Sequence, residues 1–121
     1  MALAMTSQGY NKPVSVENLL AEARVRGYTQ HGEVYSVDYM STLAAEQLPD
    51  HKPEILIDVQ SNQESIINPM TQGALILIPY DADFNHAPCL KHGHKAHWAL
   101  LVGLITCRYS NYLLIYSVGQ Y

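Results

Sequence analysis

Apolar residues recur at helical spacing in two segments near the start of the chain. Ser15 and Ser36 each stand directly before such a segment, where a side-chain hydroxyl can cap the first free amides of a helix. Gly27 and Pro49 follow the two segments and are residues at which helices commonly end. These signals predict one helix between Ser15 and Gly27 and a second between Ser36 and Pro49. The expected apolar faces are Val16, Leu19, Leu20 and Ala23 in the first helix, and Val37, Met40, Leu43, Ala44 and Leu48 in the second.

The rest of the chain has the apolar, β-branched runs that are typical of strands. Residues 54–59 and 74–80 are short runs of this kind, bounded by turn residues. Between them, residues 61–73 have the pattern of a short helical turn at most. Residues 97–106 and 112–118 predict an antiparallel hairpin. Because two helices precede a series of strands, we expect an α+β fold with an antiparallel sheet, in one domain over residues 1–121.

Residues 81–96 separate two predicted strands and have neither helical nor strand periodicity. A loop of this length within a small domain is commonly functional, and this one leads directly to His97. Both faces of the strand that begins at His97 are apolar, which predicts a central strand covered on both sides. A histidine at the mouth of such a strand is held firmly while its ring reaches a cleft, which suits a general base. The alternative is a histidine that caps the strand and hydrogen-bonds to a loop carbonyl.

Composition narrows the classes of function. The net charge is −4, and the seven Lys and Arg residues are scattered, so no basic surface for nucleic acid is expected. No apolar run approaches the roughly 18 residues of a membrane span, and the first residues lack the basic start of a signal peptide. Two cysteines do not form a disulfide framework, which favours a reduced, cytoplasmic protein. Charged residues make up 15% of the chain, which suggests that a further segment or partner covers some apolar surface.

The histidines and one cysteine near the loop raise the possibility of a zinc site. The residues involved have suitable ligand types, but their spacing, H-x2-C-x2-H-x-H-x2-H, matches no closed structural zinc site. We therefore predict no metal and no cofactor. Two carboxylates, Asp81 and Asp83, follow a strand and could orient a histidine, bind a substrate amine or simply form a solvated turn. The residues of the possible zinc site are His86, Cys89, His92, His94 and His97.

Two long segments of the chain resemble the actin maturation protease family. The sequence "GALILIPYDADFNHAPCLKHGHKAHWALLVG" is similar to that family's "LIPYD-D-N--P--K-GHKAHWA" motif, and "ARVRGYTQHGEVYSVDYMSTLA" to its "A…GYT..GE.FS…L" region. The resemblance extends over most of residues 1–105. It implies a fold related to papain-like and C39-like cysteine peptidases. It also implies a cysteine aminopeptidase that removes the acetylated N-terminal residue of newly made actin.

By this resemblance, His97 takes the place of the family's catalytic histidine. Asp81, Asp83 and Asn85 are candidate substrate-binding residues from their place in the matched loop. The family's nucleophile is a cysteine in a "Q-CGLVAL-MA" motif at the start of a helix, where the helix end and an imidazolium lower the thiol pKa. The opening "MALAM" resembles the residues that follow this Cys-Gly-Leu, so the nucleophile and its oxyanion-binding glutamine would precede Met1.

Neither cysteine of this chain occupies the family's nucleophile position. Cys89 lies in a Pro-flanked loop with no helix start, and Cys107 follows the histidine by ten residues. Asn111 is the one Asp or Asn after His97 that could orient the imidazole. We therefore expect a peptidase domain that is incomplete at both ends and lacks cysteine-protease activity by itself. The alternatives are a non-catalytic module that binds actin or another peptide through residues 81–96, and a zinc-binding protein.

Overall fold

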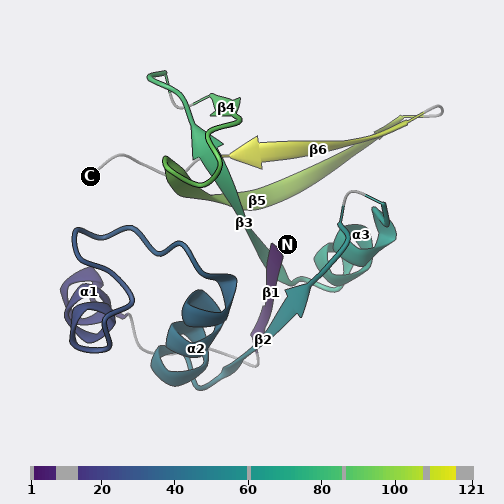
Figure 1. Cartoon of the computed structure of the whole chain (residues 1–121). Coiled ribbons are helices and arrows are strands. Elements are labelled where there is room, and N and C mark those ends of the chain that lie inside the picture. Colours follow the sequence, from purple (N-terminus) through teal and green to yellow (C-terminus); the bar gives the residue numbers. More distant parts are fainter. Residues whose placement is uncertain (1, 8–13, 60, 86, 108–109, 117–121) are drawn as a thin grey trace.

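The computed structural model describes residues 2–7, 14–59, 61–85, 87–107 and 110–116, of which residues 2–7, 106–107 and 110–116 are described by their backbone alone. The fold is α+β, with helices on both sides of an antiparallel sheet (Figure 1). Within the described residues the helices are α1 (Val16–Val25), α2 (Val37–Gln47) and α3 (Glu64–Thr71). The strands are β1 (Ala2–Ser7), β2 (His51–Leu56), β3 (Leu75–Ala82), β4 (Pro88–Cys89), β5 (Ala96–Cys107) and β6 (Ser110–Tyr116).

The described strands form one sheet in the order β2-β1-β3-β5-β6, with β4 paired to the end of β3. Each pairing is antiparallel, so the expected sheet type is confirmed. The expected order of elements is partly wrong, because strand β1 precedes the helices and lies between β2 and β3. The family resemblance places residues 2–5 in a helix, whereas here they extend along two neighbouring strands and complete their hydrogen bonding.

The two predicted helices and their ends are confirmed. The Ser15 hydroxyl accepts a hydrogen bond from the Asn18 amide at 3.4 Å, and the Ser36 hydroxyl accepts one from the Tyr39 amide at 3.3 Å. Each bond satisfies an amide that has no partner inside its helix. Gly27 follows α1 with a φ of 70°, a conformation that suits glycine at a helix C-terminus. Local sequence chemistry therefore sets the bounds of both helices.

Helix α3 corrects the prediction of a short helical turn at most over residues 61–73. Gln63 makes no capping hydrogen bond through its side chain, and Pro69 lies inside the helix, so local signals for this helix are weak. Its stability comes from packing, since Ile66 is only 2% exposed and belongs to a cluster with Ile76 and Leu101. Tertiary burial thus overrides the local preference of the sequence.

Several strand bounds differ from the predicted ranges. β2 spans His51–Leu56 instead of residues 54–59, and it includes Pro53. Proline has no amide to donate, and it is tolerated here because β2 lies at the edge of the described sheet. Part of the predicted loop 81–96 is extended: β3 continues to Ala82, and the short strand β4 pairs with it. The predicted hairpin is confirmed as β5 and β6.

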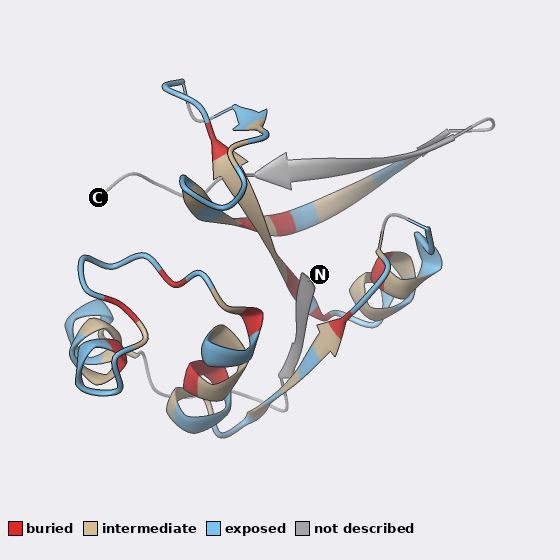
Figure 2. Cartoon of the chain, viewed as in Figure 1, coloured by how far each residue is buried: buried red, intermediate tan, exposed pale blue. Residues whose placement is uncertain are grey.

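Alternate residues of β3 and β5 point to opposite faces of the sheet and pack against different helices. On one face, Ile76 is fully buried, and Leu101, its partner across the strands, is 1% exposed beneath α3. On the other face, Leu77 and Trp98 pack with the apolar side of α2. Figure 2 shows the buried residues concentrated in the middle of these strands and on the inner sides of the helices. The predicted two-sided cover of β5 is confirmed for its first half, whereas Val102 is 54% exposed.

A groove of about 340 Å³ separates α1 from α2 and reaches the sheet at Leu77. Apolar side chains of both helices line it, among them Leu19, Leu20 and Leu43. No helix in the described parts of the chain combines the length and apolar character that crossing a bilayer requires.

Replacement of Leu101 by alanine should destabilise the fold strongly. The substitution leaves a cavity between the sheet and α3, which costs about 2–5 kcal/mol in the free energy of unfolding. The matched control is Leu90→Ala, because Leu90 is 96% exposed and its loss should change stability by less than about 0.5 kcal/mol. Urea unfolding can be followed by the fluorescence of Trp98, the chain's one tryptophan. Equal effects of the two substitutions would contradict the assigned core.

Candidate active site

His97 is the second residue of β5 and pairs with Tyr80 of β3. Its side chain is exposed, and the two rings are tilted by 50° with centroids 6.0 Å apart. Its imidazole lines a cavity of about 280 Å³. The expectation of a histidine at a strand mouth whose ring reaches a cleft is therefore met in its geometry. The other residues of this cavity are Ala82, Asp83, Phe84, Lys91 and Lys95.

One ring nitrogen of His97 is held by the main chain. Nδ1 lies 3.0 Å from the carbonyl oxygen of Lys95. A carbonyl oxygen can only accept, so Nδ1 carries the proton in this contact, and the lone pair of the neutral ring is on Nε2. A neutral imidazole has one basic nitrogen in either tautomer, and in this contact that nitrogen is Nε2. It is also the contact that a structural, strand-capping histidine would make, so the adjoining cavity is what favours a chemical role.

Asp81 organises the loop that carries Lys95. Its carboxylate accepts hydrogen bonds from the amides of Lys91 at 2.9 Å, Gly93 at 2.9 Å and Lys95 at 3.3 Å. These bonds, that of Gly93 first, lower the pKa of Asp81 below its ordinary value. The Lys95 carbonyl also accepts from the Ala82 amide at 2.9 Å. Asp81 thus fixes the loop whose carbonyl orients His97, and its predicted contact with substrate stays a prediction.

The two other predicted substrate residues have different surroundings. Asp83 lies with His97 in the cavity, and its carboxylate is 3.2 Å from the ammonium group of Lys91. The Phe84 amide and Lys91 lower the pKa of Asp83. The Asn85 side chain accepts a hydrogen bond from the Ala87 amide at 3.0 Å, which shapes the turn after β3. Of the three residues, Asp83 is the one that lines the cavity with His97.

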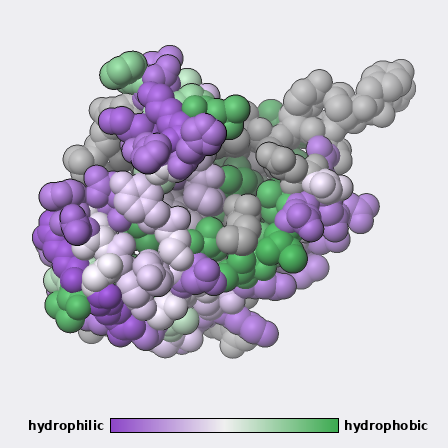
Figure 3. Space-filling model, in the orientation of Figure 1, coloured by the Kyte–Doolittle hydropathy of each residue, from purple (hydrophilic) through white to green (hydrophobic). Residues whose placement is uncertain are grey.

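The sequence analysis did not single out Lys91 and Lys95 as site residues. Both stand in the "K-GHKAHWA" motif, and Lys95 precedes His97 by two residues, so the motif contained a usable signal. Figure 3 shows hydrophilic side chains gathered over the loop between β3 and β5, at the top of the view. The candidate site thus lies at one end of the sheet and is lined mainly by polar side chains, two of which are the lysines Lys91 and Lys95.

Neither cysteine can act with His97 in the same chain. Cys89 pairs with Asp81, which pairs in turn with Ala96, so these three residues share the face opposite to that of His97. Cys107 follows His97 by ten residues along one strand, which places its backbone about 30 Å away. Asn111 pairs with Thr106 near the same distant end, so it does not orient His97. The expectation that neither cysteine serves as nucleophile agrees with this geometry.

The possible zinc ligands do not come together in the described part of the chain. There, no three His, Cys, Asp or Glu side chains lie close enough to hold one metal ion. His86, which belonged to the possible set, lies outside the described residues.

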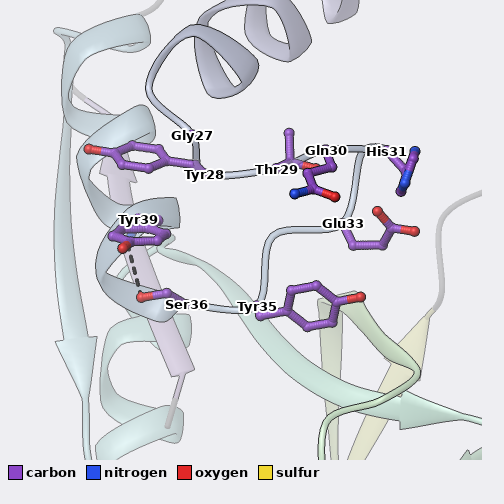
Figure 4. Close-up of a pocket in the computed structure, with 9 residues that line it drawn as sticks. All are labelled: Gly27, Tyr28, Thr29, Gln30, His31, Glu33, Tyr35, Ser36 and Tyr39. Carbon is purple, nitrogen blue, oxygen red and sulfur yellow. Dashed lines mark hydrogen bonds between the residues drawn. The ribbon is translucent and has the colours of Figure 1, made fainter.

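A second cavity, of about 480 Å³, lies on the segment between α1 and α2 (Figure 4). The rings of Tyr28 and Tyr39 are stacked 4.2 Å apart on one side, and Glu33 and Tyr35 lie on the other. This segment is joined to β5 by a hydrogen bond of 2.8 Å from the indole nitrogen of Trp98 to the Val34 carbonyl. The "GYTQHGEVYS" segment that carried the second resemblance therefore builds a cavity wall next to the strand of His97.

The family described as "Actin maturation protease-like, C-terminal domain" matches residues 1–105. The chain belongs to this family. It is 47% identical over 94 residues to the actin maturation protease of Mus musculus, in a match that covers 76% of this chain and 26% of that protein. It is 33% identical over 106 residues to the actin maturation protease of Drosophila melanogaster, covering 88% of this chain and 40% of that protein.

The relative from Homo sapiens, also named actin maturation protease, is 41% identical over 93 residues, covering 76% of this chain and 26% of that protein. The chain thus spans between about a quarter and two fifths of the length of the curated relatives that it matches. No solved structure matches the chain, so the relation to papain-like and C39-like peptidases stays a prediction of the resemblance.

Replacement of Asp81 by asparagine should loosen the loop of residues 91–95. In Asp81→Asn, the amides of Lys91, Gly93 and Lys95 should exchange faster with solvent, because a neutral amide accepts hydrogen bonds more weakly than a carboxylate. Asp50→Asn is the matched control, since Asp50 lies exposed in a turn. Amide hydrogen exchange, measured by NMR, should be faster at these three amides in Asp81→Asn and unchanged in Asp50→Asn. Unchanged protection in Asp81→Asn would contradict the role of Asp81.

The same hydrogen bonds predict the direction of a pH effect. Because folding lowers the pKa of Asp81, its contribution to loop order is complete above the unfolded value of about 3.9 and is lost as the pH falls through the folded pKa. The amide signals of Lys91 and Gly93 should therefore titrate together, with a midpoint below the unfolded value of about 3.9 for an aspartate. A common midpoint at or above about 3.9 would contradict the assignment.

Proposed function

We propose that this chain is part of a cysteine peptidase that removes the acetylated N-terminal residue of immature actin, with His97 as general base. The observation that carries the proposal is the geometry of His97 within the matched motif. Its Nδ1 is held by the Lys95 carbonyl, and its ring lines a cavity. The relatives from Mus musculus, Drosophila melanogaster and Homo sapiens are named for a protease of actin maturation, which supports actin as the substrate.

In this proposal the imidazole acts through Nε2 in three steps. It first takes the proton of a cysteine thiol, and the thiolate attacks the carbonyl carbon of the scissile amide. The resulting imidazolium then returns that proton to the leaving amine, which leaves the acetylated residue bound to the cysteine as a thioester. Finally the imidazole takes a proton from a water molecule, which hydrolyses the thioester, and returns the proton to the cysteine sulfur. The contact of Nδ1 with a main-chain carbonyl supports this cycle, because it keeps the same ring face toward the cavity in both protonation states.

The proposed nucleophile is the cysteine of the family's upstream "Q-CGL" motif. The register of β1 supports this source, since Met5 pairs with Leu75 and Leu3 with Leu77. Earlier residues of β1 therefore pair with later residues of β3, in the direction of Tyr80 and its partner His97. A segment that precedes β1 is directed toward the same end of the sheet as the imidazole. The 121 residues alone are expected to lack peptidase activity.

The cytoplasm is the proposed place of action, because a thiol nucleophile and the free thiol of Cys89 suit a reducing compartment. The second candidate function is a non-catalytic module that binds an actin N-terminus or another peptide. The observation that favours it is the exposed apolar surface of residues 81–96, where Phe84, which lines the cavity, is 94% exposed and Leu90 is 96% exposed. Side chains of this kind contact peptides whether or not cleavage follows.

Extension of the chain at its N-terminus by the family segment with the glutamine and the Cys-Gly-Leu should produce peptidase activity. The extended protein should release the acetylated first residue from an N-terminal peptide of immature actin, as followed by mass spectrometry. His97→Ala in this protein should lower the rate by at least about 100-fold, the usual contribution of a positioned acid–base group.

His94→Ala is the matched control, because His94 lies in the same loop but outside the cavity lining. It should keep most of the activity. Cleavage that survives His97→Ala would contradict the proposed base. If the extended protein binds the peptide but does not cleave it, the binding-module alternative replaces the peptidase.

A further inference from the structure

The segment that joins α1 to α2 carries negative charge only. Residues 27–39, which include the first turn of α2, contain Glu33 and Asp38 but no lysine or arginine. Glu33 lines the cavity of about 480 Å³, whereas Asp38 does not. In the part of the chain that the structure describes, the Glu33 carboxylate has no ion-pair partner. The cavity therefore contains one carboxylate whose charge is not offset.

Arg26, the cation that directly precedes this segment, is already engaged. Its Nε and Nη2 atoms lie 2.6 Å from carboxylate oxygens of Glu22 and Glu46, and its side chain is also hydrogen-bonded to that of Tyr28. Two carboxylates around one guanidinium group leave this cluster with a net negative charge. Arg26 therefore does not offset Glu33. It fixes Tyr28 against α1 and α2, since Glu22 and Glu46 belong to these two helices.

Tyrosine rings form much of the cavity wall. The rings of Tyr28 and Tyr39 are stacked, with their centroids 4.2 Å and their planes 10° apart. Figure 4 shows this stack on one side of the cavity and Tyr35 with Glu33 on the other. Tyr35 is 59% exposed and Tyr39 is 44% exposed, so ring surface is available to a ligand. The face of an aromatic ring carries partial negative charge and attracts a cation.

Hydrogen bonds hold the chain between these rings in one conformation. The Thr29 hydroxyl accepts from the Gly32 amide at 2.7 Å, and the Val34 carbonyl accepts from the Trp98 indole at 2.8 Å. Gly32 has a φ of 119°, which glycine adopts without strain. Glu33 and Tyr35 flank Val34 and are therefore tied to strand β5. A cavity whose walls are fixed in this way binds a ligand without the entropic cost of ordering a mobile loop.

We propose that this cavity is a second binding site, which takes the guanidinium group of an arginine side chain in a peptide. A guanidinium group donates two parallel hydrogen bonds to a carboxylate, here that of Glu33, and its flat face stacks on a tyrosine ring. An acidic side chain is disfavoured, because Glu33 would repel it. The two cavities share no lining residue, so the proposal does not depend on peptidase chemistry at His97.

The test compares two acetylated and amidated pentapeptides of glycine and alanine, with either arginine or citrulline at the central position. Citrulline has nearly the same shape as arginine but no charge. Binding to the full 121-residue chain is measured by NMR titration at about 0.15 M salt, where the screening length is about 8 Å. The arginine peptide should bind about 5- to 30-fold more tightly, which corresponds to about 1–2 kcal/mol from a cation–π contact and an exposed ion pair.

The position of the site is read from the same titration. The arginine peptide should shift the amide signals of residues 28–39. It should also shift the indole signal of Trp98, because this group donates to the carbonyl between Glu33 and Tyr35. Shifts that map to residues 81–97 instead would overturn the proposal.

Two substitutions in the cavity should lower the preference for arginine. Glu33→Gln should reduce it to less than about threefold, because the rings alone then attract the cation. Tyr35→Leu should also reduce it, because one ring is lost. Asp38→Asn is the matched control, since it removes the same charge from the same segment outside the cavity lining, and it should leave the ratio almost unchanged. A Trp98 indole proton that stays protected from exchange in each free variant will show that the segment is in place.

Equal binding of the two peptides, binding of neither, or an unchanged ratio in Glu33→Gln would also overturn the proposal. An equal loss in Asp38→Asn would do the same, because the attraction would then come from the general negative charge of the segment. These outcomes concern binding at residues 28–39. Cleavage by the N-terminally extended protein tests the proposed function separately, so either proposal can fail while the other stands.

Discussion

The carboxylate of Asp81 is the interaction on which the candidate site depends. It accepts hydrogen bonds from three amides of residues 91–95, and those amides have no strand or helix neighbours to accept from them. Both main-chain groups of Lys95 are hydrogen-bonded. Its amide donates to Asp81, and its carbonyl oxygen accepts from His97 Nδ1 and from the Ala82 amide. Because β3 is an interior strand, the carboxylate that holds the loop is itself fixed by the sheet. The orientation of the imidazole is thus set by backbone contacts that converge on one side chain.

The second constraint is the two-residue period of β5. His97 and Trp98 are adjacent in sequence but point to opposite faces of the sheet. His97 shares a face with its partner Tyr80, whereas Trp98 faces α2. Through its bond to Val34, Trp98 holds the segment of the second cavity against the same strand. A slip of one residue in the β3–β5 register would exchange the two side chains. Six residue pairs between β3 and β5 oppose such a slip, which couples the site to the helical layer.

The parts of the fold that could be predicted are those whose signals are local. Ser15 and Ser36 cap helices by accepting hydrogen bonds from amides three residues further along the chain, so the sequence pattern was enough to predict where each helix begins. Helix α3 was missed because burial of Ile66 against distant strands stabilises it despite Pro69. Strand β1 was missed for the same reason, since its extended form depends on pairing with residues more than 40 positions away. His97 was singled out through its motif, and orientation of a histidine was one role considered for Asp81. That Asp81 acts through the amides of residues 91–95 could not be predicted, because main-chain amides leave no mark in a sequence.

The charges of the site follow from the same geometry. Asp81 is next to the cavity loop, but three main-chain amides already compensate its carboxylate. Asp83 points into the cavity and is offset by Lys91. Within the described residues, no carboxylate pairs with the Lys95 ammonium beside His97. Main-chain amides stabilise the ionised Asp81 carboxylate without a cation, so this acid holds the loop and leaves both lysine ammonium groups for other contacts.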